Sequence, residues 1–304
     1  MDKKDIKLIA IDVDGTLLNS KQEMTPRVEK ALRDAIDQGV MVVFATGKTR
    51  NAVQAHIKKL DLNAPGIFVQ GLVAYDTDGK LIHNQTLEPR VARQVITFAE
   101  DRGFALLAYS GSRILAKTNN KELTESITKY HEMPPEVVGA LQNLLIDTPI
   151  NKLMAVGDAH GIKSLRWQLN AMIGSNCKLV QAAIPEMLEI LPPQGSKGTA
   201  LKVVCKHYKI SADHVLAIGD AENDIEMIQY AGIGVAMGNA EQKVKDAAKY
   251  TVASHDEDGV AEVIERFVLK AKPMPEKEPD KEQEKKLTTE DTEKKEEKKE
   301  EGAS

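Results

Sequence analysis

The sequence lacks the features of disulfide-bonded and membrane-spanning proteins. Among its 304 residues there are two cysteines, Cys177 and Cys205, which lie far apart without a CxxC spacing. This pattern indicates neither a disulfide framework nor a thiolate zinc site. No apolar run approaches the roughly 18 residues that a membrane-spanning helix needs. We therefore expect a protein of a reducing compartment that has no membrane partner.

An excess of positive charge is also missing. The net charge is -5 at pH 7, whereas a protein that binds nucleic acid through phosphate contacts normally has a basic face. We therefore expect no nucleic-acid partner. The first residues pass from charged side chains directly into an apolar segment, which leaves no room for a cleavable signal peptide. The expected location is cytoplasmic.

The composition changes sharply near the C-terminus. Residues 272–304 contain no aromatic residue and one leucine, so they cannot bury enough apolar surface to offset the entropy of ordering. This charged tail is predicted to be disordered, and a solubilising extension is favoured over an interaction segment. The remaining chain has the apolar content for a real core, and its length favours one large domain or two moderate ones.

The body of the chain alternates strand-like and helix-like segments. Residues 6–11 and 40–47 are apolar runs typical of buried strands, and between them Thr25 and Pro26 begin a helix that Gly39 ends. This alternation predicts a doubly wound parallel sheet with helices on both faces. The same pattern returns late in the chain, in residues 196–210, 214–220, 222–232, 233–239, 240–249, 250–254 and 258–270.

The middle of the chain has a different pattern. Residues 85–188 predict helices packed on a small, mostly antiparallel sheet. We therefore predict an α/β core formed by residues 1–84 and 189–271, with an α+β domain inserted between the two halves. Trp167 is expected in the core of the inserted domain.

Polar side chains follow several of the predicted strands. Asp12 and Asp14 end the first strand, Thr46 ends the second, and Asp220 ends a later one. Strand residues two apart share a face, so the first two carboxylates are expected to point together and to need a cation. The carboxyl ends of parallel strands meet at one crevice, which predicts that these residues converge.

Lys197 and Asp224 complete this pattern. The lysine stands at the start of a helix, where the helix dipole disfavours a cation unless an anionic partner is near. Each feature alone is weak, since an Asp at a strand end usually makes a turn or a cap. Together, and in this order along the chain, these residues indicate a catalytic site.

The chemistry that uses such a set is phosphoryl transfer to a carboxylate. Asp12 would attack phosphorus as the nucleophile, and Mg2+ held by Asp12 and Asp220 would remove the repulsion between carboxylate and phosphate. Asp14 is placed as the acid and base that protonates the leaving oxygen and then activates water. Thr46 and Lys197, with backbone N–H groups near Gly47, would bind the transferring oxygens.

Four segments in this order resemble the four motifs of the haloacid dehalogenase superfamily: residues 12–18, 45–47, 196–201 and 219–227. The insertion resembles the type IIB cap of the Cof-like phosphatase branch. The resemblance implies a Rossmann-like core with a cap, and a magnesium-dependent phosphatase that hydrolyses a small phosphomonoester, such as a sugar phosphate, through an aspartyl-phosphate.

The resemblance also implies roles for individual residues. Asp14 would be a metal ligand through its backbone carbonyl, and Asn223 and Asp224 would support the metal and the lysine. Two positions depart from the family pattern, because Lys48 stands where an arginine is usual and Gln70 where an asparagine is usual. These departures concern substrate contacts and leave the nucleophile unchanged.

Other functions compete with hydrolysis. A phosphosugar mutase or other phosphotransferase uses the same arrangement and passes the phosphoryl group to a sugar. A signalling module of the receiver type predicts about half the length and no segment like residues 219–224, and a non-catalytic phospho-ligand binder would be expected to lose Asp12 or Asp14. The substrate, the residues of the inserted domain that choose it and the oligomeric state are left open by the sequence.

Overall fold

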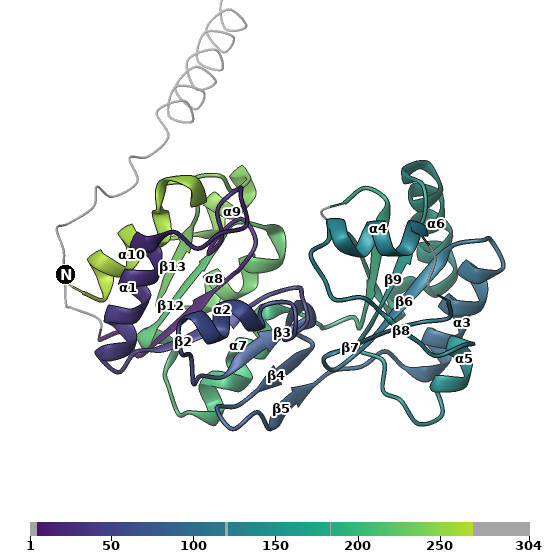
Figure 1. Cartoon of the computed structure of the whole chain (residues 1–304), viewed down its shortest axis with the longest axis horizontal. Coiled ribbons are helices and arrows are strands. Elements are labelled where there is room, and N and C mark those ends of the chain that lie inside the picture. The colour runs from purple at the N-terminus through teal and green to yellow at the C-terminus, as the bar shows by residue number, and fades with distance from the viewer. Residues whose placement is uncertain (1–4, 119–120, 183, 270–304) are drawn as a thin grey trace, which may run out of the picture. The chain divides into compact units, whose positions relative to one another are not determined.

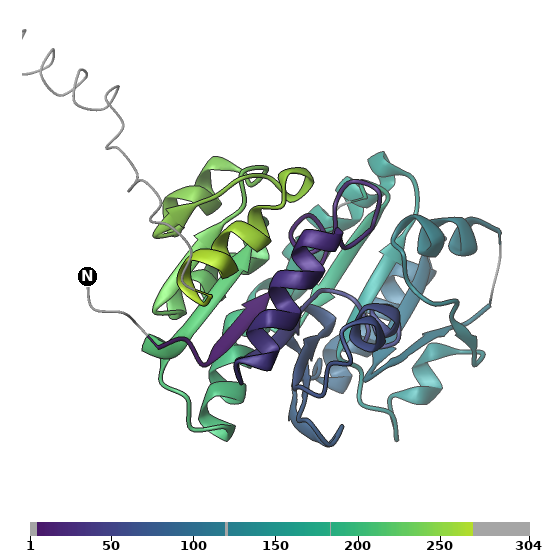
Figure 2. The same ribbon diagram turned by 60° about the vertical axis from the view of Figure 1, so that its left-hand side comes forward.

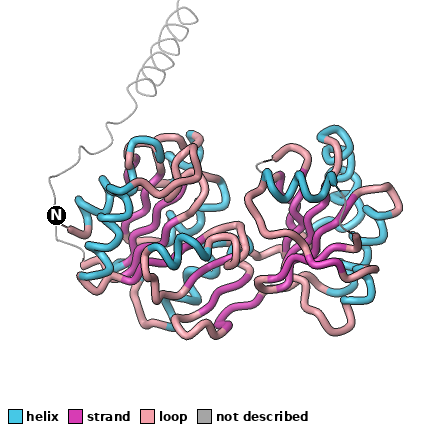
Figure 3. Tube along the Cα trace, viewed as in Figure 1, coloured by secondary structure: helices cyan, strands magenta, loops and turns pink. Residues whose placement is uncertain are grey.

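The computed structural model describes residues 5–118, 121–182 and 184–269 (Figure 1). The predicted charged tail, residues 272–304, lies outside the described residues, so its disorder stays a prediction. None of the helices in the described ranges combines the length and apolar character that crossing a bilayer requires. The tube in Figure 3 separates the helices from the strands of two sheets.

The first sheet is formed by strands from the N-terminal and C-terminal parts of the described chain. Its strands are β1 (Leu8–Ile11), β2 (Met41–Ala45), β3 (Gly66–Phe68), β4 (Val73–Tyr75), β5 (Leu81–Asn84), β12 (Val215–Gly219), β13 (Ile233–Ala236) and β14 (Tyr250–Thr251). They follow the order β14-β13-β12-β1-β2-β3-β4-β5, in which the first six are parallel and β4 and β5 are antiparallel to their neighbours. The predicted doubly wound α/β core is confirmed.

Helices cover both faces of this sheet, so its central strands β1, β2, β12 and β13 are apolar throughout (Figure 2). Leu8 and Ala10 point toward α7 (Lys197–His207) and α8 (Ile225–Tyr230), and the alternate strand residues point to the other face. There α1 (Pro26–Asp37) packs against α10 (Gly259–Phe267). Two further short helices are α2 (Gln54–Lys59) and α9 (Gln242–Ala247).

Two helix starts follow the side chains that the sequence indicated. Thr25 precedes α1 and its hydroxyl oxygen accepts a hydrogen bond from the Val28 amide, with Pro26 as the first helical residue. Ser196 caps α7 in the same way by accepting from the Thr199 amide at 3.0 Å. The second cap fixes where Lys197 begins its helix.

The second sheet is formed by the middle of the chain. Its strands are β6 (Ala105–Ser110), β7 (Arg113–Ala116), β8 (Glu136–Val137), β9 (Lys152–Val156), β10 (Lys178–Gln181) and β11 (Met187–Leu191). They follow the order β10-β11-β9-β6-β7-β8, antiparallel except for the pair β7 and β8. We call this sheet and its helices the cap. The division of the chain into domains stays a prediction, and the boundary expected after residue 188 falls inside β11.

Helices α3 (Pro89–Glu100), α5 (Leu141–Leu144) and α6 (Ala159–Ile173) pack on one face of the cap sheet, and α4 (Lys121–Lys129) is a further cap helix. The expectation for Trp167 is wrong, because its side chain is 74% exposed. On α6 the residues that reach the core are spaced by three and four positions, and residue 167 falls outside that stripe: Ile162, Leu165, Leu169 and Ile173.

Gly71 brings the end of β3 against the start of α7. Its φ is +83°, and a Cβ atom built there would lie 2.2 Å from the carbonyl oxygen of Ser196. A side chain at this position would therefore both adopt the left-handed backbone region and displace the helix start that carries Lys197. The close approach of these two backbones helps to form the site.

Gly71→Ala should destabilise the protein more than Gly39→Ala. Both glycines have φ near +80°, which costs an alanine about 1 kcal/mol, but nothing lies within 4 Å of a Cβ at Gly39. The clash at Gly71 should add about 1–3 kcal/mol. Urea denaturation of both variants measures the difference, and equal losses would mean that the contact with Ser196 relaxes without cost.

Candidate active site

The polar residues predicted at the strand ends do converge at one edge of the first sheet. Asp12 follows β1, and Asp220 follows the neighbouring strand β12. One oxygen from each of Asp12, Asp220 and Asp224 lies within 4.8 Å of the other two. Three carboxylates at this spacing form a site that could hold a metal ion.

Lys197 is buried between two of these acids. Its Nζ atom lies 2.5 Å from Asp12 Oδ1 and 2.7 Å from Asp224 Oδ1, and its side chain is 1% exposed. Burial alone would lower the pKa of Lys197, but the two carboxylates raise it above the ordinary value. The lysine is therefore a fixed cation, and its partners explain why a positive charge stands at a helix start.

Asp224 orders the loop that follows β12. Its Oδ1 atom accepts from Lys197, and its Oδ2 atom accepts from the backbone amides of Asp220 and Ala221 at 3.0 Å each. The side chain is fully buried. Because both of its oxygens are already engaged, Asp224 is better suited to support the site than to bind a further ligand.

The other two carboxylates lack enough positive charge. Burial, with the charges of Asp224 and Asp220, raises the pKa of Asp12 well above its ordinary value, although Lys197 acts in the opposite direction. Burial, followed by the charge of Asp224, raises the pKa of Asp220 to about 6. One lysine for three acids leaves a net negative site, which is the condition that favours a bound cation.

Asp14 contacts a different lysine from Asp12. Strand β1 ends at Ile11, so the alternation used to place both acids on one face does not extend to them. Lys48 Nζ donates to Asp14 Oδ1 at 2.5 Å, and the Lys48 residue is 6% exposed while Asp14 is half-buried. The two acids thus lie near one another but are held by separate cations.

The loop after β2 packs closely around Thr46. This residue is fully buried, and its hydroxyl oxygen accepts from the Lys48 amide at 3.2 Å, which leaves the hydroxyl hydrogen available to donate. The backbone carbonyl of Gly47 accepts from Lys152 of the cap at 3.2 Å. The loop is therefore bound from both the first sheet and the cap.

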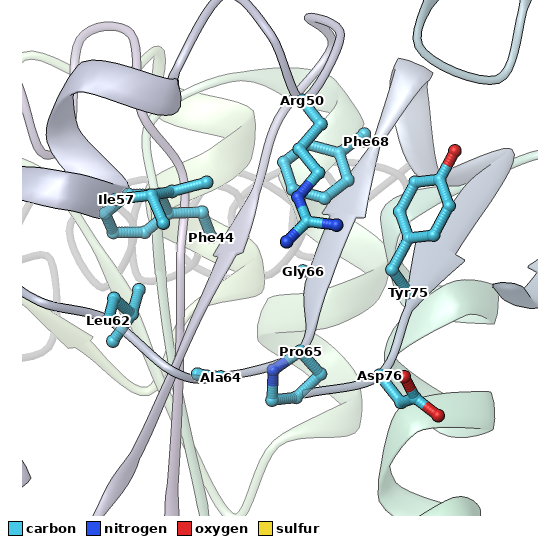
Figure 4. A pocket seen from close by; sticks show the side chains of 10 residues that line it. All are labelled: Phe44, Arg50, Ile57, Leu62, Ala64, Pro65, Gly66, Phe68, Tyr75 and Asp76. Carbon is cyan, nitrogen blue, oxygen red and sulfur yellow. The ribbon is translucent and has the colours of Figure 1, made fainter. Parts of the chain in front are cut away.

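Arg50, the second cation after this loop, lies in a separate hollow. Figure 4 shows its guanidinium group among Phe44, Ile57 and Tyr75. The guanidinium carbon is 5.5 Å from the centre of the Tyr75 ring. Lys48, rather than Arg50, is the basic residue of this segment that contacts Asp14.

Two further residues that the sequence did not assign, Lys152 and Glu189, belong to the surroundings of the site together with Gln70. Gln70 accepts from Asn223 Nδ2 and donates to Glu189 Oε2, both at 2.8 Å, and Lys152 contacts Glu189. Asn223, predicted to support the metal and the lysine, thus uses its amide nitrogen on Gln70, and its Oδ1 atom has no hydrogen-bond partner among the described residues. The only signal for Lys152 and Glu189 in the sequence is that each is the single charged residue of an otherwise apolar strand.

A pocket of about 270 Å³ adjoins these residues. The cap contributes Arg166 and Lys178, and the core contributes Ser196, Glu222 and Asn223. Ser196 and Asn223 are the chain neighbours of Lys197 and Asp224, whose own side chains do not line the pocket.

A family model described as haloacid dehalogenase-like hydrolase matches residues 9–264. The chain belongs to this hydrolase family. The match spans both sheets, and it confirms the resemblance carried by the four motifs. The assignment of a role to each motif residue stays a prediction.

Relatives of known name or structure agree with the family. The chain is 36% identical over 87% of its length to endoribonuclease YBEY, chloroplastic, of Arabidopsis thaliana, and it spans 47% of that protein. It is 32% identical, covering 87% of this chain and 97% of the other, to 5-amino-6-(5-phospho-D-ribitylamino)uracil phosphatase YcsE of Bacillus subtilis. A crystal structure of a haloacid dehalogenase-like hydrolase from Bacteroides thetaiotaomicron matches with a TM-score of 0.78, 29% identity, and coverage of 86% of this chain and 99% of that one.

In metal-free buffer, Asp220 should lower the stability of the protein as the pH rises from about 4 to about 6. Its pKa is about 6 in the folded chain against an ordinary 3.8, so the folded state binds more protons in this interval and loses up to about 3 kcal/mol as the group ionises. Urea denaturation with a chelator should therefore give a flatter pH profile for Asp220→Asn. Asp34→Asn, at an exposed acid of α1, should keep the original slope. Identical pH profiles for the unmodified protein and both variants would show that Asp220 does not cause this pH dependence of stability.

Proposed function

We propose that this hydrolase is a magnesium-dependent phosphatase that acts on a small phosphomonoester through a phosphoryl group carried by Asp12. The observation that supports this most is the Asp12 carboxylate, held at 2.5 Å by the buried Lys197 ammonium beside a second acid, Asp220. A nucleophile needs to be oriented and ionised. The charge-assisted hydrogen bond to the buried lysine orients Asp12 and favours its ionised form, and a bound cation would offset the burial that still raises the pKa of this carboxyl group. The phosphatase name of the relative from Bacillus subtilis agrees with this chemistry.

The donor set fits Mg2+. Asp12 and Asp220 offer carboxylate oxygens, the hard ligands that this ion takes in small number while it keeps waters and substrate oxygens. The hydroxyl group of Thr16 donates to Asp220 Oδ1 at 3.0 Å and orients that carboxylate. When bound, the ion would neutralise negative charge on substrate phosphate. The backbone carbonyl of Asp14 is proposed as a further ligand from the family resemblance.

The protein's own groups would then carry two balanced steps. An oxygen of Asp12 forms a bond to phosphorus while the bond to the leaving oxygen breaks, and Asp14 gives that oxygen a proton. Asp14 next takes a proton from a water molecule whose oxygen attacks phosphorus, and the bond from phosphorus to Asp12 breaks, which frees inorganic phosphate. The Thr46 hydroxyl group, the Gly47 backbone and Lys197 would bind the transferring oxygens throughout.

The size of the neighbouring pocket favours a metabolite as substrate. A volume of about 270 Å³ lies at the lower end of small-molecule sites, and the polar residues that line it would orient a hydrophilic leaving group. Lys48 lies against Asp14, where it would stabilise negative charge on the phosphoryl group or on the leaving oxygen. We therefore expect esters of small polar alcohols rather than phosphorylated macromolecules.

Asp12→Asn should abolish turnover. A panel of small phosphomonoesters with Mg2+ should yield inorganic phosphate, and the variant, which keeps the shape of the side chain but loses the nucleophilic oxygen, should be slower by about 10⁴-fold or more. Asp34→Asn should retain full activity. Turnover retained in Asp12→Asn would exclude the mechanism, and an isomerised sugar phosphate in place of free phosphate would indicate a mutase.

Mg2+ should raise the free energy of unfolding, because it binds only where the acids are assembled. At about 100 times the dissociation constant the gain should be about 2.7 kcal/mol, visible as a higher midpoint in thermal unfolding and reversed by a chelator. Asp220→Asn should lose most of this gain, and Asp34→Asn should keep it. A gain of equal size in Asp220→Asn would place the ion elsewhere.

A further inference from the structure

The cap carries a buried ion pair on the face of its sheet opposite α3, α5 and α6. Lys152 of β9 and Glu189 of β11 both have side chains that are 0% exposed, and Lys152 Nζ lies 2.5 Å from Glu189 Oε1. The Tyr130 hydroxyl group donates to the same carboxylate oxygen at 3.1 Å, and the lysine nitrogen lies 4.3 Å from the centre of the Tyr109 ring. The pair is thus enclosed by cap residues on several sides.

The same pair reaches the first sheet at two points. Lys152 Nζ donates to the Gly47 carbonyl oxygen at 3.2 Å, and Glu189 Oε2 accepts from Gln70 Nε2 at 2.8 Å. Gln70 in turn accepts from Asn223 at 2.8 Å. The pair of Lys152 and Glu189 therefore contacts the loop after β2 directly, and it contacts the loop after β12 through the Gln70 side chain.

A second cap carboxylate contacts the loop after β2. Glu132 accepts from the Thr49 amide at 2.7 Å and from the Thr49 hydroxyl group at 2.8 Å, and it is 8% exposed. Three cap groups, from Glu132, Lys152 and Glu189, thus form hydrogen bonds with the segments that surround the proposed nucleophile.

The energetics argue against a purely structural role. A buried ion pair loses the hydration of both charges, and apolar residues of similar size are usually as stabilising or more so. The backbone beside it is also strained, since Val69 and Gln70 have φ of +53° and +61°, a region that side chains, and β-branched ones above all, avoid. Charges and strain together place the Gln70 amide between Glu189 and Asn223.

We propose that Lys152 and Glu189 are positioning residues for the reaction, an inference that rests on the proposed phosphatase function. Lys152 fixes the Gly47 carbonyl, and with it the loop that would bind the phosphoryl oxygens. Glu189 fixes Asn223 through Gln70. Neither residue touches the reacting atoms, and the phosphoryl-binding loop takes its active geometry only when the cap pair is in contact with it.

Single and double variants of the full-length chain distinguish an effect on the position of the loop from an effect on stability. Lys152→Met and Glu189→Leu alone should each destabilise the fold and lower kcat, because each leaves one buried charge unpaired. The double variant should recover the stability but keep a kcat about 10- to 100-fold below the unmodified protein, with KM changed far less. A purely structural pair predicts that stability and kcat recover together, and that result would overturn the inference.

A matched control and a second readout keep the inference distinct from the proposed function. Arg113→Met with Glu136→Leu removes an exposed cap pair and should change neither kcat nor stability. Amide hydrogen exchange of residues 45–50 should be at least about tenfold faster in the Lys152 and Glu189 double variant than in this control. If the unmodified protein released no phosphate from any ester, the proposed function would fail, while the exchange rates would still decide the positioning role. Equal exchange in both double variants would exclude it.

Discussion

The contact of the Lys197 ammonium group with the carboxylates of Asp12 and Asp224 is the interaction on which the rest of the site depends. It joins three chain segments that are distant in sequence, one at the end of β1, one at the start of α7 and one after β12. The contact is buried, so removal of the lysine would leave two carboxylates without their cation in a poorly solvated place. The parallel sheet brings the three segments to one edge, and the charges then fix their side chains.

This arrangement of three carboxylates and one lysine leaves the site two positive charges short of neutrality. Lys197 serves two acids, and Asp220 is the third, oriented by Thr16 but without a lysine of its own. The raised pKa values of Asp12 and Asp220 are the electrostatic consequence of that shortage. Exposed ion pairs elsewhere on the molecule contribute little to stability, whereas an imbalance among buried acids changes what the site can bind.

Much of the fold could be predicted from the sequence because its signals are local. Apolar runs, the caps Thr25 and Ser196 and the turn residues mark most of the elements, and the position of an acid or a lysine at an element end indicates the crevice. The pairings of Lys152 with Glu189 and of Gln70 with Asn223 could not be predicted. They depend on strand register in the cap and on cap residues that meet the first sheet about 100 positions away in sequence. The error for Trp167 has a different cause, because the phase of the apolar stripe on α6 places residue 167 on the side of the helix opposite the core.

Lys48 connects the departure from the family pattern with the geometry of the acids. A guanidinium fork tends to bind both oxygens of a carboxylate, whereas the Lys48 ammonium group contacts Oδ1 of Asp14. The acid and base role proposed for Asp14 needs one carboxylate oxygen directed toward the substrate, and a point charge on the other oxygen leaves this possible. The same ammonium group lies on the loop that Lys152 holds through the Gly47 carbonyl. The cap lysine therefore contacts the residue next to the lysine that holds Asp14, so a shift of Gly47 would be expected to move Lys48 as well.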